Sequence, residues 1–221
     1  MKFSYPDIKK VFDTDEGINC LIIENQHLFY DICIDLSNQL EGEDGKAVVS
    51  IDDQPIDVSK NAELLMQFVP FNINKKALLT RLCSVTERIA VSPEYYEMSM
   101  EQISGWEKFL IEITNQLTGS IVFSKMTINN LIKSAGLEFE EDYSSLAEAL
   151  IDYMELVRQY DKEKLFFLVN LRSYISDEEC ELFFDTVHRK DLKIMLIESS
   201  EHTLLGNEKR YIIDGELCEI S

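Results

Sequence analysis

The stretch KLFFLVNLRSYISDEECELFFDTVHRKDLKIMLIE, residues 164–198, decides the fold. Its two apolar runs, 165–169 and 192–197, have the length and composition of buried strands. The segment 176–189 between them has helical spacing, and Ser176 with Glu179 forms a capping box that satisfies free amides at a helix start. Strand, helix and strand within about 35 residues predict a right-handed crossover between two parallel strands.

The first 70 residues alternate in the same way between strand and helix patterns. After the segment 41–45, which contains two glycines, the apolar runs 47–51 and 64–68 lie on either side of a polar turn at 52–55. The expected elements are a strand at 18–24, a helix at 28–40, strands at 47–51 and 64–68 around a turn at 52–55, and a last strand at 211–213. The sequence therefore predicts the α/β fold class, with a parallel sheet built from both ends of the chain.

Residues 74–160 contain helical patterns and hardly any strand signal. Ser92 and Pro93 are typical of a helix start, and Gly136 is typical of a helix end. The expected helices cover 74–90, 92–117, 127–135 and 146–160. We therefore expect two domains, an α/β head domain at 1–73 and 161–221 and an α-helical leg domain inserted at 74–160.

The chain has 41 acidic and 21 basic side chains and a formal net charge of −20. Such a body repels nucleic acid and anionic membranes at long range, which disfavours a general nucleic-acid-binding role. Five cysteines, an odd number without a C-x-x-C pair, indicate reduced thiols rather than disulfides or a zinc site. The longest apolar run has five residues and the first ten residues lack a signal-peptide core, so we expect a cytoplasmic protein.

The turn after the first predicted strand, residues 24–27, has the sequence ENQH. A phosphate-binding loop needs glycines and a lysine at this place, and Gly45-Lys46 precedes a strand instead and is followed by alanine. We therefore expect no nucleotide pocket. Polar residues do close predicted strands, where parallel α/β sheets bind ligands, although solvated strand ends have the same composition. These residues are Glu24, Asn25, Asn170 and Glu198.

Short acidic runs occur at Asp52-Asp53 and at Asp177, Glu178 and Glu181. Clustered carboxylates can hold magnesium in a nuclease, but such runs are also usual in solvated turns and helix starts. The spacing of the Ser, His, Asp and Cys residues indicates no nucleophilic triad. We therefore expect no catalytic residues and no enzyme activity.

Residues 60–92 contain five basic and two acidic side chains, a local charge of +3 in a chain whose other residues sum to −23. Four of these cations, Lys75, Lys76, Arg81 and Arg88, lie in the helix predicted at 74–90, and the two arginines share its polar face. Guanidinium groups can reach phosphates from such a face. An ordinary solvated face also explains the pattern, and DNA binding gains weight only if several copies converge around a shared cavity.

Several segments occur in a characteristic order along nearly the whole chain. They are FS (3–4), LIIE (21–24), FVPFNIN (68–74) before LLTRL (78–82), TINNLIKSAG (127–136), KLFFLVN (164–170) with ISDE (175–178), IMLIE (194–198) and YIID (211–214). In this order and with compatible gaps, the chain resembles the ring-forming adaptation protein of type II-A CRISPR systems. The specificity lies in the order, because each segment alone consists mainly of strand or helix core residues.

This resemblance implies an accessory protein of bacterial adaptive immunity that is needed for spacer acquisition and has no known catalysis. Family members have a degenerate P-loop ATPase-like head domain and a helical leg domain, and their tetrameric rings thread linear double-stranded DNA through a basic central hole. They cooperate with the CRISPR integrase pair and the type II effector nuclease, and no membrane is involved. The alternative, favoured by the charge of −20, is an acidic protein-interaction scaffold for that machinery without DNA binding of its own.

The family also has an acidic stretch before the segment that corresponds to residue 126, and its carboxylates contribute to calcium sites. Here residues 120–125 have the sequence SIVFSK, which lacks the acidic side chains of that calcium site. We expect Lys125 to supply the positive charge that calcium supplies elsewhere, since an ammonium can occupy a carboxylate-lined site. If a metal binds, the remaining clustered oxygen donors are Glu140, Glu141 and Asp142, in what is otherwise a solvated loop.

Three further lysines, Lys133, Lys162 and Lys164, match positions where family members have lysines. The resemblance implies DNA contacts for them, and solvated helix and loop ends are the alternative. The complete expected DNA-binding set is Lys75, Lys76, Arg81, Arg88, Lys133, Lys162 and Lys164.

Overall fold

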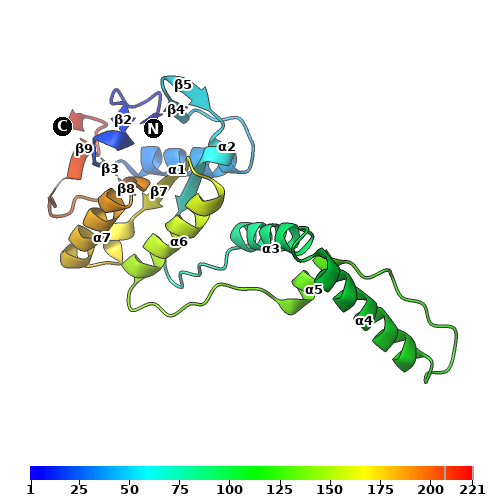
Figure 1. The fold of residues 1–221 in the computed structure, drawn as a ribbon. Coiled ribbons are helices and arrows are strands. Elements are labelled where there is room, and N and C mark those ends of the chain that lie inside the picture. Colours follow the sequence, from blue (N-terminus) through cyan, green and yellow to red (C-terminus); the bar gives the residue numbers. More distant parts are fainter. Residues whose placement is uncertain (207, 221) are drawn as a thin grey trace. The chain divides into compact units, whose positions relative to one another are not determined.

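Figure 1 shows a computed structural model of the chain, which describes residues 1–206 and 208–220. The chain forms two compact units. The first, which we call the α/β unit, consists of Met1–Ile73 and Glu141–Ser221, and the second, the helical unit, consists of Asn74–Glu140. The helical unit is therefore an insertion within the sequence of the α/β unit.

The α/β unit is built on a six-stranded sheet with the strand order β10-β9-β3-β8-β7-β6. Its strands are β3 (Ile18–Ile23), β6 (Ala62–Leu65), β7 (Leu165–Val169), β8 (Lys193–Glu198), β9 (Glu208–Ile213) and β10 (Glu219–Ile220). All neighbours pair in parallel except β10, which is antiparallel to β9. The predicted α/β class with a parallel sheet is therefore confirmed.

The stretch 164–198 forms the predicted strand, helix and parallel strand. Strands β7 and β8 are adjacent and parallel, and α7 (Asp177–Arg189) connects them. Both reciprocal bonds of the capping box are present, because the Ser176 side chain accepts from the Glu179 amide and the Glu179 carboxylate accepts from the Ser176 amide.

Helices cover both faces of the main sheet (Figure 1). On one face α1 (Gln26–Leu40) buries Leu28, Ile32 and Leu36 in a hydrophobic core that also contains Phe167 and Met195 from the central strands. On the other face α7 lies beside α6 (Leu146–Tyr160). This two-sided covering explains why the central strands are apolar without alternation.

A second, four-stranded antiparallel sheet packs on the α1 side, and it differs from our expectation. Its order is β2-β1-β4-β5, with β1 (Lys2–Ser4), β2 (Phe12–Asp13), β4 (Val48–Ile51) and β5 (Gln54–Ile56). The two predicted strands at 47–51 and 64–68 do not flank one turn. Instead β4 turns into β5 through Asp52 and Asp53, both with the positive φ that two-residue hairpin turns require, and the later strand, β6, joins the main sheet.

The helical unit contains α3 (Lys76–Ala90), α4 (Tyr96–Thr114) and α5 (Ile128–Ala135). Helix α3 packs against α5, where the Asn129 Nδ2 donates to the Glu87 carboxylate at 2.6 Å. The predicted helix start at Ser92 is wrong, because the Ser92 carbonyl accepts from the amides of Tyr95 and Tyr96 in a turn that precedes α4. Within 1–206 and 208–220, none of the helices combines the length and apolar character needed to span a bilayer.

The predicted leg boundary at residue 160 is also wrong, since residues 141–160 lie in the α/β unit. Helix α6 buries Leu150, Tyr153 and Met154, and the Tyr153 hydroxyl donates to Glu63 at the edge strand β6. At the other end of α6, the Arg158 guanidinium donates to the backbone carbonyl of Asp191 at 3.2 Å. An apolar stripe that faces a sheet has the same spacing as one that faces another helix, so the sequence pattern did not distinguish these partners.

Within the residues that the structure describes, the remaining short elements are two 3-10 turns and one helix. They are η1 (Thr14–Glu16), α2 (Val58–Asn61) and η2 (Leu171–Ser173).

Candidate functional site

Four of the predicted DNA-binding cations lie at the start of α3 or along it. Lys75 is the N-cap residue and is half-buried, whereas Lys76, Arg81 and Arg88 are exposed. Arg81 and Arg88 are seven residues apart, which places them on nearly the same face of the helix. Within the described residues, Lys76 and Arg88 have no ion-pair partner, so their charge is available to an external anion.

The other three predicted lysines differ in their surroundings. Lys133 is exposed in the last turn of α5, in the same unit as α3. Lys162 is exposed in the α/β unit. The side chain of Lys164 is only 10% exposed, and its ammonium donates to the Lys60 carbonyl at 2.9 Å and lies 3.8 Å from Asp161. These contacts hold Lys164 within the fold and count against a phosphate contact.

The candidate metal donors do not converge. The helical unit ends at Glu140, whereas Glu141 and Asp142 begin the second part of the α/β unit. The Glu141 carboxylate accepts from the Ile73 amide at 2.9 Å. Across 1–206 and 208–220, no group of three or more His, Cys, Asp or Glu side chains is arranged to hold a metal ion. The residues of a single chain therefore do not fit a calcium site at this place.

Lys125 does not make the contact that we expected. It is exposed in the segment between α4 and α5, which has no regular secondary structure. It has no carboxylate partner in the described part of the chain. A single chain therefore does not form a carboxylate-lined site around this ammonium.

The polar residues at the strand ends mainly stabilise turns. The Asn25 Oδ1 accepts from the Leu28 amide at 3.0 Å, and its Nδ2 donates to the Gly215 carbonyl at 3.0 Å. The Asn170 Oδ1 accepts from the Ser199 amide at 2.8 Å, and Glu24 is exposed. Because only Glu24 and Asn25 separate β3 from α1, this turn offers no loop of amides to surround a phosphate.

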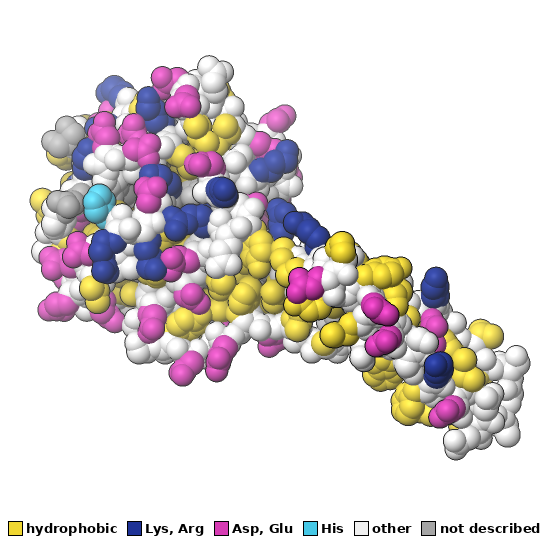
Figure 2. Space-filling view, in the orientation of Figure 1, with side chains coloured by type: hydrophobic (Ala, Val, Ile, Leu, Met, Phe, Trp, Pro, Cys, Tyr) yellow, Lys and Arg dark blue, Asp and Glu magenta, His cyan; other side chains and the backbone are white. Residues whose placement is uncertain are grey.

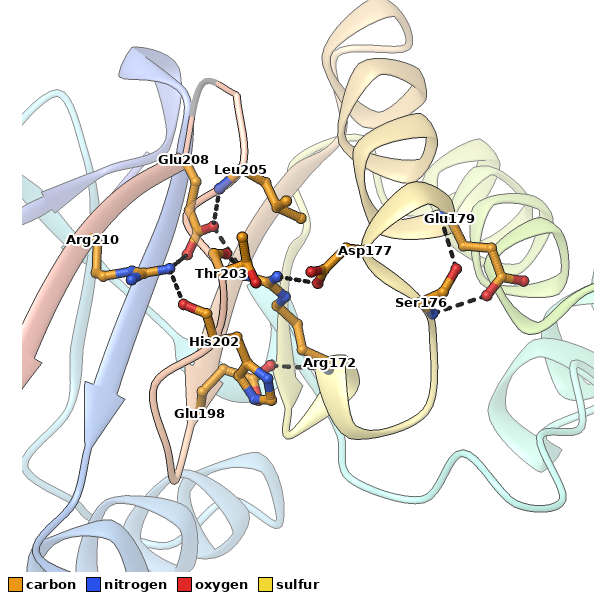
Figure 3. A network of polar contacts seen from close by, with 10 residues as sticks. All are labelled: Arg172, Ser176, Asp177, Glu179, Glu198, His202, Thr203, Leu205, Glu208 and Arg210. Atoms are coloured by element: carbon orange, nitrogen blue, oxygen red, sulfur yellow. Dashed lines mark hydrogen bonds and ion pairs between the residues drawn. The ribbon is translucent and has the colours of Figure 1, made fainter.

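Glu198, the fourth strand-end residue, belongs to a buried polar cluster (Figure 3). We use this name for Arg172, Asp177, Glu198, His202, Glu208 and Arg210. The Arg172 side chain is almost completely buried, and its Nη1 donates to Glu208 at 3.1 Å and to the Thr203 carbonyl at 2.8 Å. Its Nη2 donates to Asp177 at 2.7 Å. Two carboxylates therefore compensate this buried guanidinium.

The second arginine of the polar cluster holds the same segment of chain. The Arg210 Nη2 donates to the His202 carbonyl at 2.8 Å and lies 3.6 Å from Glu208, while its Nη1 donates to Glu201 at 2.8 Å. His202 belongs to the segment 199–206, which leads from β8 to β9 without any helix or strand. Two guanidinium groups thus hold backbone carbonyls of the segment 199–206, whose described residues form no helix or strand.

Glu198 and His202 form an unusual pair inside this cluster. The Glu198 Oε1 accepts from the Arg172 amide at 3.2 Å, and its Oε2 lies 3.6 Å from the His202 Nε2. Neither of these two facing atoms has a hydrogen bond to a described residue, and both are buried. Burial raises the pKa of Glu198 to about 7, whereas burial and the nearby Arg172 charge lower the pKa of His202.

A cavity of about 670 Å³ lies between η1, α7 and the segment that precedes β9. Five carboxylates line it, together with one lysine and one histidine. Asp15 and Glu16 are paired with cations, but Glu181 and Asp185 of α7 have no ion-pair partner among residues 1–206 and 208–220. Such a cavity suits a cationic group better than a phosphate.

Charge and exposed apolar surface are divided unequally between the two units. The helical unit has 7 basic and 8 acidic side chains, which leaves 14 basic and 33 acidic ones, a net charge of −19, in the α/β unit. Figure 2 shows hydrophobic side chains gathered over the helices of the helical unit. On α4, exposed large side chains include Met98, Trp106, Phe109, Ile111 and Ile113.

The sequence model of a family described as CRISPR-associated protein (Cas_Csn2) matches residues 39–217. The chain belongs to the Cas_Csn2 family. This confirms the resemblance inferred from the ordered segments. The match begins within α1 and extends beyond β9, so it includes the whole helical unit and most of the main sheet.

A solved structure supports the fold of this Cas_Csn2 chain. The crystal structure of Stu0660 of Streptococcus thermophilus superposes with a TM-score of 0.56 at 15% sequence identity, over 91% of this chain and 70% of that one. At this identity the similarity concerns the fold alone. A search of curated proteins gave no match.

The buried polar cluster of this Cas_Csn2 chain was missed by the sequence analysis. Glu208 and Arg210 alternate with Lys209 and Tyr211 along β9, and alternating polar residues normally indicate a solvated strand face. The available signal was the pairing of opposite charges, Glu208 with Arg210, on one face of a strand next to the apolar run at 211–213. Such a pair indicates a buried ionic contact only if something covers that face.

Proposed function

We propose that this Cas_Csn2 chain is a non-catalytic accessory protein of CRISPR spacer acquisition in the cytoplasm, and that it forms a tetrameric ring which binds linear double-stranded DNA. Family membership supports the role in CRISPR immunity. The observation that carries the DNA-binding part is the separation of charge between the two units. The cations on α3 and α5 belong to a unit with nearly balanced charge, whereas the net negative charge resides in the other unit.

The electrostatic argument depends on distance. At physiological salt the Debye length is about 8 Å, so a phosphate senses mainly the side chains next to it. Exposed Lys76 and Arg88 without ion-pair partners in the described residues can therefore attract DNA although the whole chain carries −20. In the ring that we propose, copies of α3 face the DNA.

The exposed apolar side chains of α4 support self-association. Monomeric proteins rarely expose a contiguous apolar patch of more than a few hundred Å², and larger patches mark interaction surfaces. Trp106 and Phe109 contact each other edge to face, with ring centroids 5.7 Å apart, yet about half of each side chain is exposed. Aromatic side chains of this kind are enriched in the centres of protein interfaces.

The absence of catalysis in this proposal has its own support. Asn25 uses its side chain to cap α1, at the place where an active P-loop protein places its phosphate-binding amides. A purified chain should therefore show no ATP or DNA turnover with magnesium. Turnover that persists through further purification, and that scales with protein concentration, would contradict this part of the proposal.

Two measurements test the ring. Light scattering should give a solution mass near four times 25.6 kDa, and a gel shift should show binding to linear duplex but not to covalently closed circular duplex of the same sequence. A closed ring loads over a free end, which explains the expected preference. A stable monomer, or equal binding to both DNA forms, would contradict threading.

The second candidate function is an acidic scaffold for the CRISPR integrase pair and the effector nuclease, without DNA binding. The charge of −19 on the α/β unit and the acidic cavity favour contacts with basic protein surfaces. The two functions differ in one measurement. A scaffold would retain its protein partners and show no salt-dependent shift of long linear duplex even at low salt.

A further inference from the structure

The segment 199–206 raises a physical question, because it connects two parallel strands without the helix that usually covers such a crossover. Its backbone carbonyls must find donors elsewhere. The Arg172 guanidinium donates to the Thr203 carbonyl, and the Arg210 guanidinium donates to the His202 carbonyl. The side chain of His202 points from the same segment toward Glu198, and its Nε2 faces the Glu198 carboxylate.

The two facing atoms lack the hydrogen bond that buried polar atoms normally have. Glu198 Oε2 and His202 Nε2 are 3.6 Å apart, a few tenths of an ångström longer than a hydrogen bond, and neither has another partner in the described residues. Two acceptors would repel each other at this distance. One hydrogen atom between them turns the contact into a hydrogen bond after a small shift.

The surrounding charges favour a proton over a metal ion. Two guanidinium groups, Arg172 and Arg210, lie in the same cluster and would repel a divalent cation. Among the carboxylates, Asp177 and Glu208 compensate the arginines, and Glu201 is more than half exposed. The remaining titratable groups near Glu198 are the thiols of Cys20 and Cys180, whose pKa values are raised by burial and which therefore stay neutral.

With Asp177 and Glu208 ionised beside Arg172 and Arg210, an ionised Glu198 and a neutral His202 would give the six-residue cluster one negative charge in excess. Burial of an unpaired charge is costly, and it favours the neutral form of the group. Both pKa directions agree with this, since burial raises the pKa of Glu198 to about 7 and lowers that of His202. A protonated Glu198 and a neutral His202 satisfy both effects with a single hydrogen atom.

We propose that the Glu198 carboxyl group carries a proton near neutral pH, donates it in a hydrogen bond to the His202 Nε2, and thereby latches the segment 199–206 onto the main sheet. With the His202 ring hydrogen on Nδ1, loss of this proton leaves two facing acceptors and loosens the segment. The same segment contributes Leu205 and Gly206 to the wall of the acidic cavity. The protonation state of one buried pair therefore controls how firmly that wall is held.

The pH dependence has a definite sign. A group whose pKa is raised in the closed state stabilises that state fully below its ordinary pKa, and this stabilisation is lost as the pH rises through the raised pKa. For Glu198 the window extends from 4.5 to about 7. His202 titrates in the opposite sense, so the contribution of Glu198 is isolated by comparing the wild-type chain with Glu198→Gln, whose amide keeps a donor for His202.

Hydrogen exchange of the full chain, read by mass spectrometry on peptides within 199–206, measures the opening of this segment. After correction for intrinsic rates, the opening constant of the wild type divided by that of Glu198→Gln should rise roughly 40-fold between pH 5 and pH 7, and less than about twofold between pH 7 and pH 8. Glu178→Gln, on the exposed part of α7, is the matched control, and its ratio should stay flat.

A flat ratio for Glu198→Gln would overturn the proposal, because it would mean that protonation of Glu198 does not affect the opening of the segment. The wild-type chain provides a second test that does not require the variant to fold. The side-chain carboxyl carbon of Glu198 should titrate near pH 7 by ¹³C NMR, and the ring nitrogens of His202, one of only three histidines, should show a neutral ring at that pH. A Glu198 midpoint below pH 5, or a charged His202 at pH 7, would equally contradict the latch.

Discussion

The two units use the same kinds of amino acids in opposite ways. The α/β unit buries large side chains such as Phe167, Leu21 and Tyr153 almost completely. In the helical unit, only Leu78 and Ser99 are buried among the described residues, although its helices are rich in Leu and Ile and also contain Trp106 and Phe109. An apolar stripe on a helix therefore shows how much surface must be buried, but it does not show whether the same chain or another copy buries it.

Charge follows the same division. The α/β unit, which has its own core, carries nearly all of the net negative charge, whereas the helical unit has almost none. Net charge keeps a self-contained unit soluble and separate. A unit that must bind neighbours and DNA benefits from the lack of net repulsion. The division of charge and the division of burial therefore support the same assignment of roles.

The largest expected difference between the units is in the response to removal of a large side chain. Phe167→Ala, in the core of the α/β unit, should lower the free energy of unfolding by about 3–5 kcal/mol, because it leaves a cavity. Phe109→Ala, on exposed α4, should lower the free energy of unfolding by less than about 1 kcal/mol when the protein is too dilute to associate. Urea unfolding monitors both, and equal losses would show that the helical unit has a core of its own.

The second test introduces a charge on the apolar surface. Phe109→Glu should abolish assembly, because an interface centre tolerates no unpaired carboxylate. Light scattering should then show a smaller particle, while circular dichroism stays unchanged. Leu182→Glu, which is 66% exposed on the acidic face of α7, is the matched control and should assemble normally. Assembly of Phe109→Glu at wild-type mass would remove α4 from the interface.

The sequence predicted most of the α/β unit because its signals are local. The apolar runs of β3, β7 and β8, the capping box of α7 and the stripe of α1 each act within one element. The second sheet was missed because β1, β2 and β5 have only two or three residues each, too few for a period to show. The start of α4 was misplaced because Ser92 has the right composition for a cap, whereas its carbonyl closes a turn instead.

The candidate site was less predictable, because it depends on contacts between distant parts of the chain. The cations of α3 followed from one local excess of charge. The polar cluster joins Arg172 with Glu208, and these residues are 36 positions apart. Lys164 illustrates the opposite error, since its position suggests a solvated loop end while its ammonium is bound within the fold.

The third test concerns the cations of the helical unit. Replacement of Lys76, Arg81 and Arg88 by Gln should weaken binding of linear duplex. The slope of the logarithm of the binding constant against the logarithm of the salt concentration should become less steep, by roughly 0.9 for each phosphate that the variant no longer neutralises. The matched control is Lys10→Gln, which removes an exposed cation from the α/β unit. Titrations at several salt concentrations give the slope. An unchanged slope would mean that other residues contact the phosphates.

The smallest expected effect compares two helix caps. Ser176 and Thr127 both accept from a backbone amide at the start of a helix, α7 in the α/β unit and α5 in the helical unit. Loss of such a cap typically costs about 1 kcal/mol. Helix α7 buries Phe183 and Val187 in the core, so Ser176→Ala should lower the thermal midpoint of the whole α/β unit, by about 2–4 °C.

Thr127→Ala should behave differently, because α5 has no buried residue and can open without the core. We expect faster hydrogen exchange within α5, by about fivefold for 1 kcal/mol, and no change in the main thermal transition. Dilute samples are needed, since neighbouring copies would otherwise stabilise α5 by mass action. If Thr127→Ala shifted the main transition as much as Ser176→Ala, the two units would unfold together, and the independence that their different burial indicates would have to be given up.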